Sequence, residues 1–228
     1  MTSAPRLILF DVDGTLVDSQ ASIVAAMTAA FDALSQPVPE RAAILGIVGL
    51  SLDHGIARLA PDLPRQTQTT LTAAYKEAFH AHRLQDGAAD RSPLYPGARA
   101  ALDTLAARPD TLLGVATGKS RRGLDALLEM HDLTGFFVSC QVADDHPSKP
   151  HPSMIEAALL ETGTGRESAV MVGDTTYDMQ MARAAGVPGI AVSWGYHAPE
   201  VLRDHADCMI DRFSDLPSAL APIWGEAE

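Results

Sequence analysis

Apolar and polar positions divide the chain into three parts with different periodicities. Residues 7–10 form a short continuous apolar run, which is typical of a strand buried on both faces. Between residues 18 and 91, apolar side chains recur at helical spacing, and nothing there has the pattern of a strand. From Pro93 onward, short apolar runs alternate with amphipathic helices, which predicts βαβ units and a mostly parallel sheet.

The expected elements follow from these periods and from the proline and glycine breaks. Strands are expected at residues 7–10, 112–116, 136–142, 169–172, 189–192 and 208–210. Later helices are expected at residues 97–107, 120–130, 152–162, 177–185 and 199–205. The first strand and the C-terminal two-thirds therefore form one α/β core, and the helical part is an insertion into it.

Within the helical insertion, breaks at prolines and glycines separate four helices. The first ends at Pro37, and two short helices are expected at residues 41–45 and 52–59. Ser51 stands where it could cap the helix at residues 52–59. The fourth helix contains Leu71, Tyr75 and Phe79 at helical spacing and is expected to stop near Gly87.

Composition narrows the class of protein. The 228 residues are 46% hydrophobic and 20% charged, as expected for a globular protein with a large core. The net charge of −12 argues against nucleic acid as the main partner, because binding a phosphate backbone needs a basic face. A small phosphorylated substrate stays compatible with that charge, because a local site can be positive on an acidic protein.

The lengths of the apolar runs and the cysteine content bear on cellular location. No stretch reaches the ~18 apolar residues that a membrane span needs, and no signal peptide is evident. The two cysteines, Cys140 and Cys208, are expected to be buried in strands and unpaired. We therefore expect a cytoplasmic protein without a membrane or nucleic-acid partner, as a monomer or a homodimer.

Two carboxylates follow the first strand directly. Asp11 and Asp13 are separated by one residue, and Gly14 marks a sharp turn after them. Carboxylates side by side at the end of a buried strand are costly unless a cation or a shared proton offsets their repulsion. A calcium loop of EF-hand type is excluded, because Ser22 stands where its glutamate is needed and Leu16 where its glycine is needed. The pair therefore predicts a metal site, a catalytic acid pair, or both.

Further polar residues follow the other predicted strands. They are Thr117, Gly118 and Lys119 after the second strand, Asp144, Asp145 and Lys149 after the third, and Asp174 and Asp178 after the fourth. Taken singly, each has an ordinary structural explanation as a turn, a helix cap or a solvated charge. Because the carboxyl ends of parallel strands meet at one edge of a sheet, we expect these side chains to line a single crevice.

The residue types in this crevice suit phosphoryl transfer. Hard oxygen ligands that favour Mg²⁺ are offered by four carboxylates, those of Asp11, Asp13, Asp174 and Asp178. Lys149 would neutralise a nucleophilic carboxylate and an incoming phosphate. Thr117 and Gly118 stand at the start of a helix, where N–H groups suit a phosphate. Asp11 could then attack phosphorus, and Asp13 could protonate the leaving group and activate water.

Four segments, in this order, resemble the motifs of the haloacid dehalogenase superfamily. They are Asp-Val-Asp-Gly-Thr at residues 11–15, Thr117-Gly118, Lys149-Pro150, and Gly-Asp-Thr-Thr-Tyr-Asp at residues 173–178. The resemblance covers nearly the whole chain and is to phosphatases with a helical cap inserted after the first strand. It implies a Rossmann-like, three-layer α/β core with a mostly parallel sheet, formed by residues 1–16 and 94–228. Residues 17–93 would form a mobile, all-helical cap.

The same resemblance implies a role for each motif residue. Asp11 would be the nucleophile, Asp13 the general acid/base, and Lys149 would orient the phosphoryl group with Asp11. Mg²⁺ would be held by the carboxylates of Asp11 and Asp174 and by the main-chain carbonyl of Asp13. Asp178 would assist at the metal, directly or from outside the ligand sphere, and Thr117 with Gly118 would bind the transferring phosphoryl group.

Within the superfamily, the chain looks most like phosphoglycolate phosphatases. Less specific segments carry this resemblance, namely Asp18-Ser19 and residues 49–52, 95–97 and 194–196. We expect Mg²⁺-dependent hydrolysis of a small phosphate monoester through an aspartyl-phosphate, with 2-phosphoglycolate as the first candidate. Inorganic pyrophosphatase, a sugar-phosphate phosphatase and β-phosphoglucomutase stay open, because they share the core motifs.

Three other classes are disfavoured by particular residues. A haloacid dehalogenase typically lacks the second aspartate, so Asp13 argues against that activity, and the complete set of acids argues against a non-catalytic binding protein. A phosphonatase would use a lysine from the cap. The only lysine there, Lys76, stands deep in a predicted helix, which argues against that activity as well.

Substrate choice is expected to depend on the cap, which would close over the core. The loop at residues 46–51 is the first candidate, because its glycines allow a close approach of the backbone, and Gly49 and Ser51 are its proposed contacts. Further candidates for binding a substrate carboxylate are His54, Arg58, Arg121 and His197. Arg122 is expected to be an ordinary surface residue.

Overall fold

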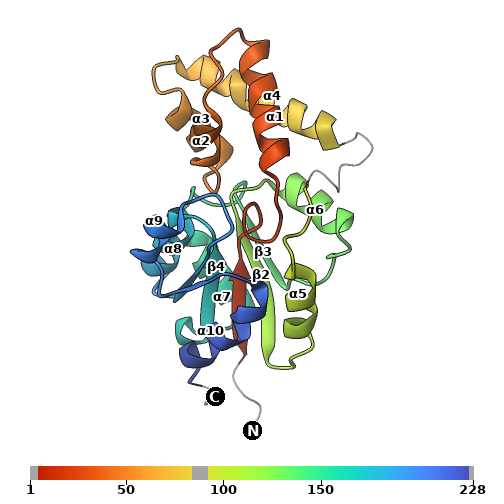
Figure 1. Ribbon diagram of the computed structural model, residues 1–228, viewed down its shortest axis with the longest axis vertical. Helices are drawn as coiled ribbons and strands as arrows, with labels where there is room; N and C mark the ends of the chain where they lie inside the picture. Colours follow the sequence, from red (N-terminus) through yellow and green to blue (C-terminus); the bar gives the residue numbers. More distant parts are fainter. Residues whose placement is uncertain (1–4, 84–91, 226–228) are drawn as a thin grey trace.

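The computed structural model describes residues 5–83 and 92–225. Four helices lie together above a sheet that carries the remaining helices (Figure 1). The strands are β1 (Arg6–Phe10), β2 (Thr111–Thr117), β3 (Ser139–Val142), β4 (Ala169–Gly173), β5 (Gly189–Val192) and β6 (Cys208–Ile210). The upper helices are α1 (Gln20–Ala33), α2 (Arg41–Leu45), α3 (Leu52–Leu59) and α4 (Arg65–Arg83). The lower helices are α5 (Ala98–Ala106), α6 (Arg121–Met130), α7 (Ser153–Thr162), α8 (Thr176–Ala185), α9 (Pro199–Arg203) and α10 (Leu216–Ile223).

The six strands form one parallel sheet in the order β3-β2-β1-β4-β5-β6, which confirms the predicted α/β fold. The first strand of the chain is central and pairs with β2 on one side and β4 on the other. From β1 the chain winds outward through β2 to β3, and later through β4 to β6. The order therefore reverses between β1 and β4, and such switch points open a crevice at the carboxyl ends of the strands.

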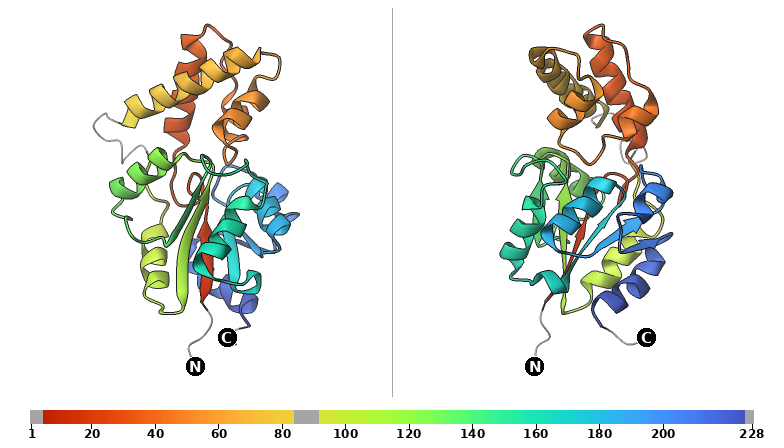
Figure 2. Two further views of the ribbon diagram at one scale, coloured as in Figure 1. Left: turned by 180° about the vertical axis from the view of Figure 1, so that it is seen from behind. Right: turned by 90° about the vertical axis from the view of Figure 1, so that its left-hand side faces the viewer.

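Both faces of the sheet are covered by helices, as Figure 2 shows. Ile8 and Phe10 point to one face and belong to a core shared with α5, α6 and α10. Leu7 and Leu9 point to the other face and pack with residues of α7 and α8. Successive side chains of a strand alternate between its faces, so a strand buried on both faces needs a continuous apolar run. This is the reason why residues 7–10 lack any polar position.

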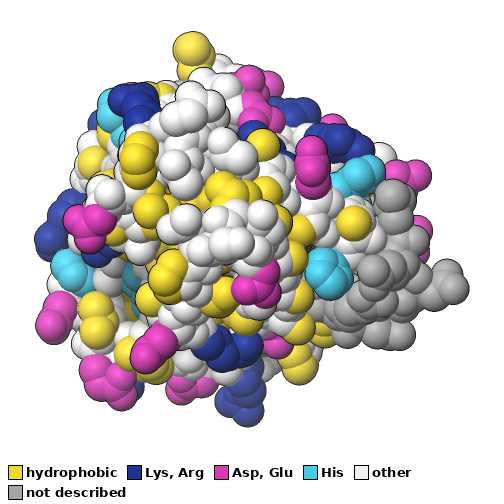
Figure 3. All heavy atoms as spheres, turned by 90° about the horizontal axis from the view of Figure 1, so that it is seen from above, with side chains coloured by type: hydrophobic (Ala, Val, Ile, Leu, Met, Phe, Trp, Pro, Cys, Tyr) yellow, Lys and Arg dark blue, Asp and Glu magenta, His cyan; other side chains and the backbone are white. Residues whose placement is uncertain are grey.

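The helices α1–α4, called the cap below, have a separate apolar core. Its buried members come from all four helices and from the loop that joins two of them: Ile23, Met27, Ala30, Phe31, Ile44, Ile47, Val48, Ile56 and Leu71. Seen from above the cap, apolar side chains gather toward the middle of this face and charged ones lie mainly around it (Figure 3). The cap begins and ends beside the sheet, where Asp18 N donates to Pro93 O at 2.9 Å. The division at residues 17–93 stays a prediction.

Most predicted elements are present, but three expectations were wrong in detail. The third strand spans only Ser139–Val142, because Phe136 and Phe137 pack against the core from the loop before it. The helix expected at residues 199–205 ends at Arg203. Cys140 and Cys208 are free but only partly buried, since β3 and β6 are the two edges of the sheet. The predicted helix end near Gly87 lies outside the described residues.

None of the helices in the described ranges is long and apolar enough to cross a membrane.

Ser51 occupies the N-cap position of α3, as expected, but its side chain makes no capping hydrogen bond to the backbone. Its hydroxyl instead donates to Asp53 Oδ1 at 2.7 Å and lies 2.8 Å from His54 Nδ1.

Candidate active site

A tight turn after β1 places Asp11 and Asp13 at the switch point of the sheet. Asp11 N donates to Val172 O of β4 at 2.9 Å, so the hydrogen bonding between the strands continues one residue beyond the end of β1. Gly14 then adopts a φ of +92°, and a Cβ at this position would overlap the carboxylate of Asp174. Only glycine combines that backbone conformation with so close an approach. The sequence Asp-Val-Asp-Gly therefore brings carboxylates of two neighbouring strands into contact range.

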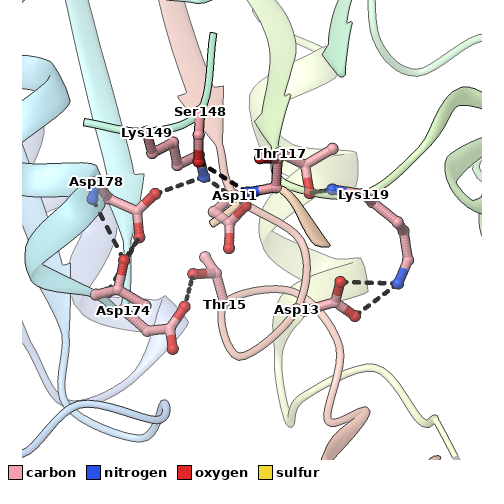
Figure 4. Close-up of polar contacts among 11 residues, drawn as sticks. Asp11, Asp13, Thr15, Thr117, Lys119, Ser148, Lys149, Asp174 and Asp178 are labelled. Atoms are coloured by element: carbon pink, nitrogen blue, oxygen red, sulfur yellow. Dashed lines mark hydrogen bonds and ion pairs between the residues drawn. The ribbon is translucent and has the colours of Figure 1, made fainter. Parts of the chain in front are cut away.

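Lys149 is the central cation of this site (Figure 4). Its side chain is fully enclosed, and its Nζ lies 2.8 Å from Asp11 Oδ1 and 2.6 Å from Asp178 Oδ1. The loop after β3 delivers this lysine, and the loops after β1 and β4 deliver the two acids. Burial alone would lower the pKa of Lys149, but the two carboxylates raise it well above the ordinary lysine value, so it stays charged.

One lysine does not balance the negative charge around it. Carboxylate oxygens of Asp11, Asp174 and Asp178 lie within 4.8 Å of one another, and all three residues are buried. Burial raises the pKa of Asp11 to about 7, with Lys149 opposing this shift and Asp178 adding to it. Burial and the nearby charge of Asp11 likewise raise the pKa of Asp174 well above its ordinary range. The cluster therefore favours an additional cation.

An unpaired oxygen shows where such a cation would be bound. Asp11 Oδ2 is buried and has no hydrogen-bond partner among the residues that the structure describes. The Asp174 carboxylate is held in place by two hydrogen bonds, because Thr15 Oγ1 donates to its Oδ1 at 2.8 Å and Tyr196 N donates to its Oδ2 at 2.8 Å. Buried acceptors of this kind are rarely left without a partner, and oxygen donors are the preferred ligands of Mg²⁺. These residues fit a divalent metal ion.

Asp178 has its own structural partners. Its Oδ2 accepts hydrogen bonds from Thr175 N at 3.0 Å and from Thr175 Oγ1 at 2.6 Å, which completes a capping box at the start of α8. Its Oδ1 faces Lys149. Both oxygens are thus engaged, and in this arrangement Asp178 orients Lys149 as well as neighbouring the acidic cluster.

Asp13 points away from that cluster toward a second lysine. Lys119 Nζ donates to its two carboxylate oxygens at 2.8 and 2.7 Å, and Ser19 Oγ also donates to Oδ1. The sequence predicts Lys119 at this edge of the sheet but does not indicate a role for it. Its position directly after Thr117-Gly118, at the end of a strand adjacent to β1, was the available signal. The same Nζ lies 5.2 Å from the ring centroid of Phe79 on the cap.

The predicted phosphate-binding residues lie where the core meets the cap loop, residues 46–51. Thr117 is buried, and its Oγ1 accepts from Lys119 N at 3.2 Å. A Cβ on Gly118 would lie 2.6 Å from Leu50 O and 2.7 Å from Gly49 O. Ser51 N donates to Ser148 Oγ at 2.9 Å, next to Lys149. The cap loop therefore makes the close backbone approach expected of its glycines, but the Ser51 side chain turns toward α3.

We expect Gly118→Ala to destabilise the protein by about 1–3 kcal/mol, since the added methyl group forces the cap loop away from the core. Thermal unfolding monitored by circular dichroism measures this loss. Gly123→Ala is the matched control, because its Cβ would meet only side-chain atoms of Lys119 and Ser120, at 3.1 and 3.2 Å. That site is helical, so alanine also gains helix propensity. Equal unfolding temperatures for the two variants would contradict the close packing at Gly118.

A cavity of about 220 Å³ lies between the core and the cap. The core contributes Asp11, Asp13, Thr117, Gly118, Lys119, Ser120, Arg122 and Gly123. The cap contributes Ile23, Met27, Ile47, Val48, Gly49, Leu50, Leu52, Tyr75, Lys76, Phe79 and His80. Residues 47–50 of the cap loop are thus part of the wall. The cavity connects the candidate nucleophile to side chains of α1 and α4.

The cap and surface residues in the wall differ from the ones expected. Four candidates are absent from the wall and have other contacts: His54 with Ser51, Arg58 with the Tyr177 ring, Arg121 with Cys140 O, and His197 with Thr176 N. Lys76 and Arg122, which were discounted, do line it. For Lys76, the direction in which α4 faces the core decides this, because helical periodicity predicts which face of a helix is apolar but not which element that face packs against.

Comparisons with known proteins agree with this geometry. Residues 8–192 match the family model described as haloacid dehalogenase-like hydrolase. The chain is 36% identical over 217 residues to a protein of Dickeya dadantii named "Probable phosphatase IndB", covering 93% of this chain and 92% of that protein. It is 37% identical to a phosphoglycolate phosphatase of Rhodospirillum rubrum, covering 93% of this chain and 89% of the relative.

Solved structures agree with the fold. A haloacid dehalogenase-like family hydrolase from Streptococcus pneumoniae aligns with a TM-score of 0.81 at 25% identity, covering 95% of this chain and 98% of the other. A hydrolase from Pseudomonas syringae aligns with a TM-score of 0.82 at 24% identity, covering 96% and 99% of the two chains. Both alignments span the core and the cap helices together.

Proposed function

The chain belongs to the haloacid dehalogenase-like hydrolase family, and from that premise we propose that it is a Mg²⁺-dependent phosphatase that acts through an aspartyl-phosphate. The observation that most supports this proposal is the environment of the Asp11 carboxylate. Its Oδ1 is held by Lys149, and its Oδ2 is buried and unpaired beside the cavity. A carboxylate held in this way can attack an electrophile that enters from the cavity. Relatives named as phosphatases support phosphorus as that electrophile.

Each residue of the site has a distinct part in the proposed reaction. Asp11 attacks the phosphorus, and the bond from phosphorus to the ester oxygen breaks. Asp13 gives a proton to the departing alkoxide and then takes one from the water that hydrolyses the aspartyl-phosphate. This releases inorganic phosphate and restores the Asp11 carboxylate. Before substrate binds, Lys119 and Ser19 hold Asp13 at the cavity wall.

Phosphate recognition depends on groups at the ends of the strands. Lys149 supplies a positive charge to the transferring phosphoryl group, and Thr117 with the N–H of Gly118 supplies hydrogen-bond donors. The carboxylates of Asp11 and Asp174 and the main-chain carbonyl of Asp13 would hold Mg²⁺, with Asp178 assisting. The bound ion supplies charge neutralisation for the phosphoryl oxygens.

Mg²⁺ is expected to stabilise the fold as well as to support activity. At a concentration about 100 times its Kd, a bound ion adds about 2.7 kcal/mol, which for a chain of this size raises Tm by roughly 5–10 °C. Thermal unfolding in EDTA and in excess Mg²⁺ measures the shift, and EDTA should abolish turnover until Mg²⁺ is restored.

Matched variants assign that shift to the acidic cluster. Asp174→Asn removes one of the three clustered carboxylates and should remove most of the Mg²⁺-dependent rise in Tm. Asp145→Asn is the control, because Asp145 lies at the surface, 3.4 Å from Arg121. Retention of full activity after thorough chelation would count against the metal.

2-Phosphoglycolate is the proposed reference substrate, because relatives from Rhodospirillum rubrum and Yersinia pestis carry the name phosphoglycolate phosphatase. Release of inorganic phosphate is measured with 2-phosphoglycolate, pyrophosphate and hexose 6-phosphates in the presence of Mg²⁺. We expect the highest kcat/KM of these three for 2-phosphoglycolate. A hexose phosphate or pyrophosphate that matches it would reject this choice, and formation of an isomeric hexose phosphate would indicate a mutase.

A further inference from the structure

The cavity above Asp11 has a wall that is unusual for a site that would bind only phosphate and glycolate. Its cap side is built from apolar side chains of α1, the cap loop, α3 and α4: Ile23, Met27, Ile47, Val48, Leu50, Leu52, Tyr75 and Phe79. The first four are buried members of the cap core, so they are held in place by packing. A glycolate group has a single methylene, which is too small to contact most of such a wall.

The size of the cavity also exceeds what a two-carbon acid needs. Its volume is about 220 Å³. An apolar protein cavity of about 150 Å³ is large enough to bind benzene. The rings of Tyr75 and Phe79 stack in this wall with centroids 5.7 Å apart, and aromatic side chains pack well against a flat apolar ring. There is room for a ring-sized group next to the phosphoryl site.

Hydroxyl-rich alcohols fit this wall poorly. A hydroxyl that is moved from water into apolar surroundings without a hydrogen-bond partner loses binding free energy, and a hexose carries several. The wall offers few donors or acceptors on the cap side, where Tyr75, Lys76 and His80 are the side chains with polar atoms. The wall therefore selects against sugar phosphates and for an apolar body.

Positive charge is concentrated in the same cavity, although the chain as a whole carries a net charge of −12. Lys76 from α4 and Arg122 from α6 both line it. Lys119 lines it too, but its ammonium group is already paired with the carboxylate of Asp13. Arg122 Nη2 lies 2.8 Å from His80 Nε2, and because arginine only donates, that ring nitrogen accepts. The guanidinium is thus oriented by a neighbour within the wall. An anionic group on the substrate would be met here.

We propose that the preferred substrate is a phosphate monoester whose alcohol carries an apolar, ring-sized body and a second anionic group. This inference rests on the proposed phosphatase function and specifies its substrate class. The phosphoryl group would lie at Asp11, the ring against the apolar cap wall, and the anion near Lys76 and Arg122.

A series of three alkyl phosphates separates the two features. Ethyl phosphate, benzyl phosphate and 4-carboxybenzyl phosphate all have aliphatic leaving oxygens, so differences in kcat/KM report mainly binding by the cap. The ring is expected to raise kcat/KM at least about tenfold from ethyl to benzyl phosphate. The carboxylate is expected to add about another tenfold, and 4-carboxybenzyl phosphate should exceed 2-phosphoglycolate.

Variants on α6 and α4 test the anion contact. In Lys76→Gln/Arg122→Gln, the ratio of kcat/KM for 4-carboxybenzyl to benzyl phosphate should fall to about 1–2. Arg121→Gln is the matched control. Arg121 is the sequence neighbour of Arg122, but it donates to Cys140 O at 2.6 Å and is absent from the cavity wall. That variant should keep the ratio of the unmodified protein.

The outcomes distinguish this inference from the function on which it rests. If ethyl and benzyl phosphate are hydrolysed equally well, the phosphatase proposal stands and the apolar substrate class is wrong. If the carboxylate effect survives in the double variant, the proposed anion contact is wrong. If none of the esters, including 2-phosphoglycolate, releases phosphate in the presence of Mg²⁺, it is the phosphatase proposal itself that fails.

Discussion

Replacing Asp11 with asparagine is expected to lower kcat by at least about 10³-fold, whichever ester is used as substrate. The amide has nearly the same shape but cannot form the proposed acyl phosphate. The variant should nevertheless fold, because burial and the nearby Asp178 charge already disfavour an ionised group at this position. Removal of that charge relieves repulsion with Asp174 and Asp178. We therefore expect loss of activity with an unfolding temperature in EDTA that is unchanged or higher.

The measurement needs two safeguards. Asp145→Asn, a surface aspartate on the loop after β3, is the matched control and should keep full activity. Mass spectrometry of acid-quenched reactions should find a phosphoryl group on the peptide that contains Asp11 in the unmodified enzyme only. Turnover by a pure Asp11→Asn preparation at the rate of the unmodified protein would reject Asp11 as the nucleophile.

The acidic site could be predicted because it depends on backbone topology. Residues 7–10 are apolar without interruption, so they had to form a buried strand, and parallel neighbours then bring their carboxyl ends together. Asp11, Lys149 and Asp178 are far apart in sequence, yet Lys149 Nζ contacts both carboxylates. No side-chain detail was needed for that expectation.

The substrate cavity could not be predicted in the same way. Which residues of α4 face the core depends on the rotation of a helix whose ends are not fixed by the sheet. Lys76 and His80 line the cavity, whereas His54 on α3 turns back to Ser51. Lys119 was missed for a related reason, since its partner is set by where its flexible side chain can reach. Asp13, one strand away, is within that reach.

Lys149→Met is expected to be the most destabilising substitution at the site, at a cost of about 3–5 kcal/mol in the absence of metal. The methionine fills a similar volume but leaves Asp11 and Asp178 buried without their cationic partner. Unfolding by urea in EDTA at pH 8 measures the loss. Activity should fall steeply too, since the phosphoryl group loses a positive charge at the nucleophile.

The pH dependence of that loss identifies its electrostatic origin. Lys149 lowers the pKa of Asp11, so its removal moves this pKa further above the present value of about 7. An acid whose pKa is raised by folding favours the folded state at low pH and loses that advantage as pH rises through the folded pKa. The variant should therefore be closer to the unmodified protein at pH 5.5 than at pH 8.

A second substitution separates charge from packing. In Lys149→Met/Asp178→Asn, one of the two carboxylates that lost their cationic partner becomes neutral, and part of the lost stability at pH 8 should return. Asp178→Asn alone removes a partner of Lys149 and weakens the cap of α8, so by itself it should destabilise. Two outcomes would mean that Lys149 stabilises the fold by its volume and not by its charge. One is a double variant whose change in unfolding free energy equals the sum of the two single changes. The other is a loss of stability in Lys149→Met that is equal at pH 5.5 and pH 8.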